Sequence, residues 1–182
     1  GVLIKGGNIM RTTNGGTSWS VVHSQDYIQR MQFASANVAY AFGGTTVHGA
    51  SGGVLAKSFD GGQTWSSIII DSKEIVAAYF NSEAMGFKVD FENTVARTTD
   101  GGETWTDIGV IPDSRLGGQV SSIIYVTDSQ MFATTFQGEI YRSSDAGNSW
   151  EVIYEAQTPL SRIYRINRTL YAVGNNGTLL KN

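Results

Sequence analysis

The chain of 182 residues contains no cysteine, which excludes disulfide bonds, thiolate zinc sites and cysteine nucleophiles. Its 2 histidines, His23 and His48, are too few to suggest a zinc site, and we expect no metal and no cofactor. No apolar run approaches the roughly 20 residues that a membrane-spanning helix needs. The formal net charge of −3 gives no global electrostatic basis for binding nucleic acid.

Charged residues are also scarce, at 16% of the chain, and the polar surface comes mainly from Ser, Thr, Asn and Gln. The absence of cysteine does not fix the compartment by itself. Few lysines together with many Ser and Thr residues favour an exported protein. We therefore expect an extracellular, periplasmic or surface-associated location.

Glycine is abundant, and the 22 glycines lie among short apolar runs, a pattern typical of all-β structure with tight turns. One motif occurs four times and reads basic, Ser/Thr, any residue, Asp/Asn, any residue, Gly, any residue, Ser/Thr, Trp. Each of the 4 tryptophans closes one copy, and successive tryptophans are 46, 40 and 45 residues apart. A period of this size predicts a β-propeller or another repeat array. The copies span residues 11–19, 57–65, 97–105 and 142–150.

The motif is explained by the folding of one tight turn. The Asp or Asn side chain accepts hydrogen bonds from backbone N–H groups ahead of it, and glycine tolerates positive φ. The tryptophan adds a large apolar plate that packs beneath the turn or against a neighbouring sheet. One carboxylate per copy is too few for a calcium site. We therefore predict a structural role for Asn14, Asp60, Asp100 and Asp145 and for Trp19, Trp65, Trp105 and Trp150.

Each repeat is predicted to hold four short strands, here named a to d in chain order, with the motif between strands c and d. The near-continuous apolar runs suit sheets that are buried on both faces. Strand a is predicted at residues 28–33, 75–80, 120–126 and 161–166, and strand b at 38–42, 84–89, 131–136 and 170–173. Strand c is predicted at 8–10, 53–56, 93–96, 139–141 and 178–181, and strand d follows each tryptophan. We expect one propeller domain or segment over 1–182, with repeats at about 1–26, 27–73, 74–117, 118–159 and 160–182.

The two ends of the chain do not complement each other. Residues 1–7 resemble a strand b, so the first repeat supplies strands b, c and d, whereas the last supplies a, b and c. This count gives three complete blades and two incomplete ones, and open blade edges promote association. We therefore expect either a segment of a larger propeller or completion by another chain. Gly1 is not an initiator methionine, so we expect a chain that is processed, tagged or cut from a longer one.

The four motif copies resemble the Asp-box, also called the BNR repeat. The resemblance covers the chain at blade spacing and implies a β-propeller of four-stranded antiparallel blades. The family includes sialidases, xyloglucan-active endoglucanases, sortilin-type receptors and photosystem II assembly-factor propellers. Residues 98–105, Thr-Thr-Asp-Gly-Gly-Glu-Thr-Trp, look closest to the assembly-factor-like proteins, which are scaffolding or interaction proteins. The resemblance implies fold more strongly than function, since Asp-boxes lie on the c–d turns, away from the usual binding face.

The residues give little support to the hypothesis that the chain is a sialidase or another glycosidase. A sialidase-like Arg-Ile-Pro string is absent, and the nearest sequence, Tyr164-Arg165-Ile166-Asn167, lacks the proline and follows the last motif. Glycosidases need two carboxylates about 5–10 Å apart. The acids on the presumed binding face lie in loops where solvated residues are expected, and no pair of them stands out, so no catalytic residue is predicted. These acids are Asp26, Asp71, Glu74, Asp90, Glu92, Asp113 and Glu155.

Three features predict a binding surface on the d–a and b–c loops. The longest b–c loop spans residues 43–53 and contains His48, and the d–a loop at residues 112–118 contains Arg115. Strand a carries arginine and tyrosine side chains that suit an interaction surface: Tyr27, Arg30, Tyr79, Arg162, Tyr164 and Arg165. We predict a non-catalytic scaffold that binds a protein, with a glycan as the next candidate ligand. The alternatives are a glycoside hydrolase or sialidase-like fragment and a virion or cell-surface structural module.

Overall fold

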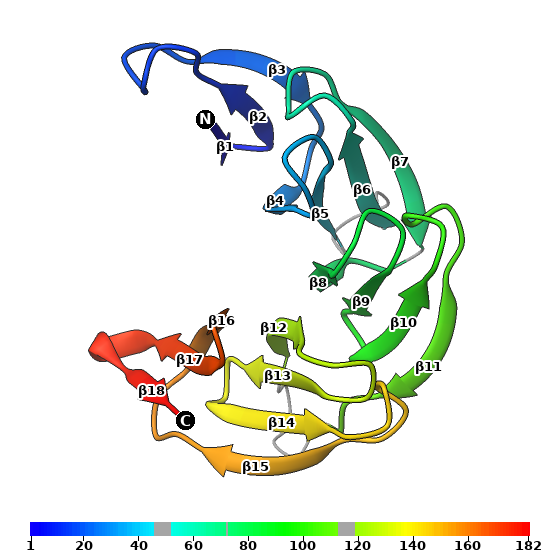
Figure 1. Cartoon of the computed structure of the whole chain (residues 1–182), viewed down its shortest axis with the longest axis vertical. Helices are drawn as coiled ribbons and strands as arrows, with labels where there is room; N and C mark the ends of the chain where they lie inside the picture. The colour runs from blue at the N-terminus through cyan, green and yellow to red at the C-terminus, as the bar shows by residue number, and fades with distance from the viewer. Residues whose placement is uncertain (46–51, 72, 113–118) are drawn as a thin grey trace. The chain divides into compact units, whose positions relative to one another are not determined.

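β-Strands account for nearly all regular structure in the computed structural model, which describes residues 1–45, 52–71, 73–112 and 119–182 (Figure 1). Within these ranges one short 3-10 helix occurs, Asn175–Gly177, and no helix has the length and apolar character needed to cross a membrane. The chain divides into two compact units. The first unit holds Gly1–Ile75, Phe80–Gly86 and Thr99–Glu103, and the second holds Val76–Tyr79, Phe87–Thr98 and Thr104–Asn182.

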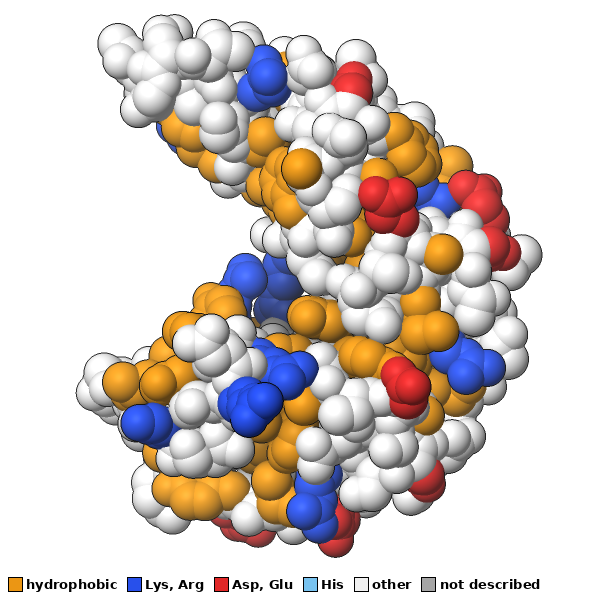
Figure 2. Space-filling model, viewed as in Figure 1, with side chains coloured by type: hydrophobic (Ala, Val, Ile, Leu, Met, Phe, Trp, Pro, Cys, Tyr) orange, Lys and Arg blue, Asp and Glu red, His pale blue; other side chains and the backbone are white. Residues whose placement is uncertain are grey.

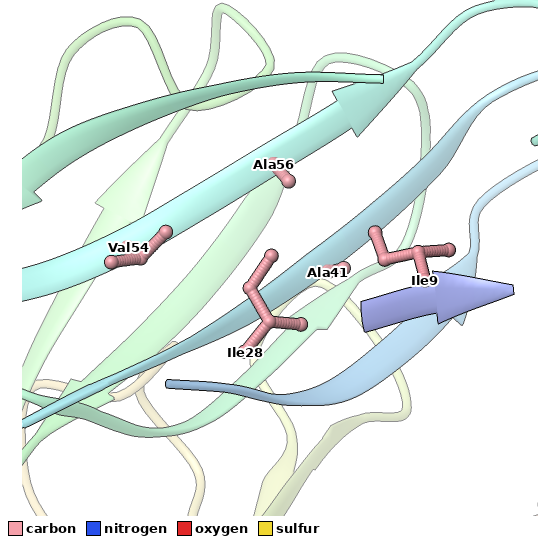
Figure 3. Close-up of a cluster of buried hydrophobic side chains, with 5 residues drawn as sticks. All are labelled: Ile9, Ile28, Ala41, Val54 and Ala56. Carbon is pink, nitrogen blue, oxygen red and sulfur yellow. The ribbon is translucent and has the colours of Figure 1, made fainter. Parts of the chain in front are cut away.

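Two antiparallel sheets belong to the first unit. The first sheet has three strands, in the order β1 (Val2–Lys5), β2 (Asn8–Arg11) and β3 (Ser20–Ser24). The second has four strands, in the order β4 (Ile28–Phe33), β5 (Ala39–Thr45), β6 (Gly52–Ser58) and β7 (Ser66–Asp71). Both sheets contribute to one apolar core, which Figure 3 shows as Ile9, Ile28, Ala41, Val54 and Ala56.

Two further sheets belong to the second unit, and a third has residues in both units. That third sheet has the order β8 (Ile75–Phe80), β9 (Gly86–Asp90), β10 (Thr94–Thr98) and β11 (Thr106–Val110). The next has β12 (Val120–Tyr125), β13 (Met131–Thr135), β14 (Glu139–Ser143) and β15 (Glu151–Glu155). The last has three strands, β16 (Leu160–Ile166), β17 (Thr169–Gly174) and β18 (Leu179–Lys181).

The predicted all-β fold with four-stranded antiparallel sheets is confirmed. Strand a corresponds to β4, β8, β12 and β16, and the predicted strand boundaries agree with the observed ones to within a few residues. The first sheet contains strands b, c and d, and the last contains a, b and c, as the sequence predicts. Strand order within each sheet follows chain order because short turns join neighbouring antiparallel strands.

Burial is greatest in the central strands of the four-stranded sheets and least in strand d. Every residue of β5, β6, β9 and β13 is buried, whereas every residue of β15 is exposed and β3 and β11 are exposed or half-buried. The central strands therefore bury both faces, which explains their continuous apolar runs. Strand d is an edge strand, and its exposed positions tolerate polar residues.

Candidate functional site

The motif carboxylates are bound within their own turns. In the second copy, Asp60 Oδ2 accepts the Thr64 hydroxyl at 2.6 Å, and Oδ1 accepts the Thr64 N–H and the Ser58 hydroxyl, each at 2.9 Å. Hydrogen bonds from Thr64 and Ser58 stabilise the ionised form and hold the pKa of Asp60 well below its usual range. The fourth copy repeats this arrangement, and hydrogen bonds from Ser149 and Ser143 lower the pKa of Asp145 to about 2.

The tryptophans of the first, second and fourth motif copies are held to the same turns. The indole N–H of Trp65 donates to the Gly62 carbonyl at 3.2 Å, and Trp150 donates to the Gly147 carbonyl at 3.0 Å. The Trp19 indole N–H does the same with Gly16 at 3.1 Å. These contacts support the structural role expected of the motif and make the indoles poor platforms for stacking a sugar.

The residues predicted to bind a partner lie in different parts of the structure. His48 and Arg115 are outside the described residues. Tyr27, which precedes β4, is 48% exposed and borders a surface hollow that Ile4 also lines, while Arg30 on β4 is half-buried. Both belong to the first unit, whereas Arg162 and Tyr164 belong to the second. Each pair is therefore considered by itself.

Tyr27 is fixed by a close backbone contact. Its carbonyl accepts the Gly44 N–H at 3.0 Å, and a Cβ atom on Gly43 would lie only 2.1 Å from the same carbonyl. Tyr27 itself has a φ of 68°, an uncommon value for a residue other than glycine. The Tyr27 backbone is thus held in place, and its exposed ring is accessible to a partner.

The strands β16, β17 and β18 form the basic sheet, our name for residues 160–182. This segment contains no Asp or Glu, although the whole chain has a net charge of −3. Figure 2 shows Lys and Arg side chains among hydrophobic ones over this sheet. Its basic residues are Arg162, Arg165, Arg168 and Lys181.

One face of the basic sheet combines positive charge with exposed aromatic and apolar groups. Tyr164 pairs with Tyr171 across β16 and β17, and Tyr171 pairs with Lys181 across β17 and β18, so these three side chains share a face. Arg162 lies two residues before Tyr164 on β16 and points the same way. Arg162 is exposed and Tyr164 is 44% exposed, so both are accessible to a partner.

Arg165 lies on the opposite face and is engaged within the protein. Its guanidinium donates to the Val126 carbonyl at 2.9 Å and to the Asn167 carbonyl at 3.0 Å. Burial raises the pKa of Tyr79, and the positive charge of Arg165 opposes this increase. Arg165 therefore ties β16 to the preceding sheet. The strand-a pattern alone did not distinguish this role from that of Arg162.

Several acids on the presumed binding face form local contacts. Asp90 is buried and accepts the N–H groups of Glu92 at 2.8 Å and Thr94 at 2.9 Å, whereas Glu74 accepts the Gln29 amide at 3.2 Å. Asp113 and the side chain of Asp71 lie outside the described part. Among described residues no group of three or more His, Cys, Asp and Glu could hold a metal ion.

Sequence reasoning missed a buried acid and most of the basic sheet. Glu139 is fully buried, and its carboxylate accepts the Thr135 hydroxyl at 3.1 Å, closing the turn between β13 and β14. The four-residue spacing of Thr135 and Glu139 was the feature of the sequence that could have indicated this contact. The acid-free composition of residues 160–182 was also visible in the sequence, but it gains meaning only when the strands place its side chains on one face.

Comparison with known proteins gives one family and several similar structures. The family described as Photosynthesis system II assembly factor YCF48 matches residues 30–181. A YCF48 bound to D1 peptide is 24% identical, with a TM-score of 0.63 over 85% of this chain and 51% of that one. The YCF48 of Cyanidioschyzon merolae is 18% identical, with a TM-score of 0.72 over 97% of this chain and 63% of that one. The GH74 enzyme of Niastella koreensis is 20% identical, with a TM-score of 0.75 over 97% and 32% respectively.

These structural similarities show a shared fold. The chain spans less than two thirds of the length of each of these three proteins. No match was found among curated protein sequences.

Proposed function

The chain belongs to the family of the photosystem II assembly factor YCF48, and on this premise we propose that it is a non-catalytic scaffold that binds a segment of a protein partner. A YCF48 structure contains a bound D1 peptide, which supports a peptide as the kind of ligand to test. The similarity to a GH74 enzyme concerns the fold alone and does not favour catalysis.

The observation that carries this proposal is the exposed face of the basic sheet. Arg162 offers several guanidinium donors in a geometry that matches a carboxylate, and Tyr164 beside it offers an aromatic surface. Arg and Tyr are enriched in the parts of interfaces that contribute most to binding. Residues 160–182 contain no acidic side chain that would compete with a ligand carboxylate for Arg162. We therefore propose an acidic, partly apolar peptide segment as the ligand.

The other predicted binding residues stay predictions. They are Tyr27 and Arg30 in the first unit, and His48 and Arg115, which lie outside the described residues. A glycan is the alternative ligand, for which the exposed tyrosines would be the contacts. We also propose an extracellular, periplasmic or surface-associated location, supported by the few lysines and the many Ser and Thr residues.

The proposal is tested by reversing one charge. An acidic peptide of alternating Glu and Leu should bind the full chain, and Arg162→Glu should weaken that binding about tenfold or more, because charged hydrogen bonds contribute about 1.5–3 kcal/mol. Arg97→Glu is the matched control, since Arg97 is an exposed arginine on β10, outside the basic sheet. Isothermal titration calorimetry at two salt concentrations gives the affinities.

Two results would contradict the proposal. One is an equal loss of affinity in Arg162→Glu and Arg97→Glu, which would indicate nonspecific attraction. The other is that a peptide with Gln in place of Glu binds as tightly as the acidic peptide, which would show that the carboxylates do not contribute to binding. Binding of oligosaccharides with loss in Tyr164→Ala would instead favour the glycan.

A further inference from the structure

Two exposed phenylalanines occupy the same place in two sheets in the middle of the sequence. Phe91 follows β9 directly and Phe136 follows β13, so each is the first residue of the turn that joins strand b to strand c. Phe91 is 43% exposed and Phe136 is 42% exposed, and both sheets have four strands. A single exposed aromatic side chain is common on a protein surface, but two at matching positions require an explanation.

The turns themselves do not require an aromatic residue. Asp90 Oδ1 accepts the N–H groups two and four residues ahead, at 2.8 and 2.9 Å, and the Thr135 hydroxyl accepts the corresponding N–H groups at 3.3 and 3.1 Å. These polar side chains close the turns whatever residue follows them. The turn between β17 and β18 has Asn175 as its first residue. The folding of the turn therefore does not explain Phe91 or Phe136.

The two turns are tied together by one peptide group. Asn93 Oδ1 in the first turn accepts the Val120 N–H at 3.2 Å, and the carbonyl of Gln119 accepts the Phe136 N–H at 3.0 Å. Because this carbonyl and this N–H belong to one planar peptide group, Asn93 Oδ1 lies within about 9 Å of the Phe136 nitrogen. Phe91 and Phe136 thus lie on adjacent turns at one edge of the second unit, and we name them the aromatic pair.

The same edge continues towards Arg162. The carbonyl of Gly138, in the second turn, accepts the Ala156 N–H at 2.8 Å, and a Cβ atom on Gly138 would lie only 2.7 Å from the Thr158 carbonyl. Residues 156–159 lead directly into β16, which carries Arg162. Closely packed backbone within the second unit therefore connects the aromatic pair with the charged face of the basic sheet.

The charges along this edge indicate how a ligand would lie on it. Glu92, which is exposed beside Phe91, repels a ligand carboxylate, whereas Arg162 attracts one. Charge complementarity of this kind fixes the register of a bound segment. Neighbouring packed sheets lie about 10 Å apart and an extended residue spans about 3.3 Å, so about three or four residues would separate the acidic group from the apolar one.

We propose that Phe91 and Phe136 bind the apolar side chain of the peptide segment whose carboxylate binds Arg162. This inference rests on the proposed function and deepens it by adding a second contact and a spacing. The ligand has an aliphatic or aromatic residue about three or four positions from its acidic residue. Arg162 selects the charge, and the two rings select the apolar group because they offer a large apolar area at low entropic cost.

The probes are two labelled peptides that differ only in their apolar residues. The first has the sequence Glu-Glu-Ser-Gly-Ser-Leu-Leu, and in the second both leucines are replaced by serine. Each is also made in reverse order, since the edge can accept either chain direction. Fluorescence anisotropy with the full chain should show that the leucine peptide, in one direction, binds at least about tenfold more tightly than the serine peptide, because its leucine side chains become buried.

The matched protein variants remove exposed rings at different places. Phe91→Asn and Phe136→Asn are combined, because Asn175 shows that such a turn folds with asparagine. Phe59→Thr is the control, since Phe59 is 66% exposed on the second motif copy and Thr99 has its place in the third. The combined variant should bind the leucine peptide about tenfold more weakly and the serine peptide almost unchanged. Phe59→Thr should change neither affinity, and thermal unfolding should show that both variants are folded.

The outcomes separate this inference from the proposed function. A loss of binding in Arg162→Glu without a loss in the combined variant overturns the aromatic pair and leaves the proposed function standing, and the opposite result does the reverse. The aromatic pair is also overturned if the two peptides bind equally or if Phe59→Thr matches the combined variant. No binding of either peptide at about 1 mM overturns both. An oligosaccharide that binds only when the two rings are present, with no peptide bound, would assign the pair to a glycan instead.

Discussion

The first and fourth copies of the repeated motif show how one turn can be preserved in two different surroundings. In the first copy, the Thr12 hydroxyl donates to Asn14 Oδ1 at 2.9 Å, and in the fourth the Ser143 hydroxyl donates to Asp145 Oδ1 at 2.8 Å. In both copies the same hydroxyl accepts the N–H of the motif glycine. The turn is therefore encoded by residues within the motif itself.

The tryptophans of these two copies differ in burial. Trp19 is 36% exposed, whereas Trp150 is 9% exposed. A Cβ atom on Gly147 would lie 2.9 Å from Ile108, in the preceding sheet, but one on Gly16 would approach only Trp19 of its own turn. A motif thus forms its turn locally, and a neighbouring sheet then determines how much its indole contributes to stability.

The largest expected effect tests this conclusion directly. Trp150→Ala should lower the free energy of unfolding by about 3–5 kcal/mol, because it removes a buried aromatic side chain and leaves a cavity. Trp19→Ala should cost about 1 kcal/mol, since much of that indole is already in water. Urea unfolding followed by circular dichroism measures both values. Equal losses would show that the indole acts through its own turn and not through the neighbouring sheet.

The distinction between contacts within a turn and contacts with a neighbouring sheet also explains how much of the structure the sequence could predict. The turns and strands depend on neighbours along the chain, so the turn at Asp60 and the strand at Ile28–Phe33 were predictable. Contacts between repeats were not predictable, because the sequence does not show which side chains meet. One example is the ion pair at 2.5 Å between buried Lys57 and exposed Glu103, which joins the second and third motif copies.

The candidate site shows the same difference between residues, which the sequence identifies, and their contacts across strands, which it does not. Arg162 and Tyr164 were identified from strand a, but their shared face with Tyr171 and Lys181 depends on the register of three strands. The aromatic pair was not foreseen either, since its two rings come from two sheets. The acid-free composition of the last repeat was visible in the sequence but was not used, and strand pairing determined which of its side chains share a face.

A second prediction uses the pH dependence of stability to distinguish the first motif copy from the fourth. The folded-state pKa of Asp145 is about 2, below its ordinary value of 3.8, so its ionised form stabilises the fold. This contribution is complete above about pH 4 and is lost as the pH falls towards 2. The first copy has Asn14 instead, and no titration at this position affects stability.

The measurement is the thermal midpoint between pH 7 and pH 2 in three proteins. Asp145→Asn should reduce the loss of stability below pH 4, and Asn14→Asp should increase it, because the new carboxylate can accept the Ser18 N–H as Asn14 does at 3.0 Å. An acid profile for Asp145→Asn that matches the unmodified chain would mean that these hydrogen bonds do not stabilise the ionised carboxylate.

The smallest expected effect concerns the residue that follows Asn14 or Asp145. Gly15 has a φ of 70° and Ala146 a φ of 61°, so both copies require the left-handed region at this position. A Cβ atom on Gly15 would meet nothing within 4 Å, so backbone strain is the main cost of adding one. Gly15→Ala should therefore lower the free energy of unfolding by about 1 kcal/mol, and Ala146→Gly should raise it by up to about 1 kcal/mol.

These opposite signs are expected because the two substitutions exchange the same pair of residues in the same turn. Glycine increases the conformational entropy of the unfolded chain, and this term offsets part of the effect of backbone strain in both substitutions. Urea unfolding midpoints for the two variants and for the double variant provide the comparison. If Ala146→Gly destabilises the protein instead, then the methyl group of Ala146 contributes packing in the fourth copy that exceeds its backbone strain, and the two copies differ in their turns as well as in their surroundings.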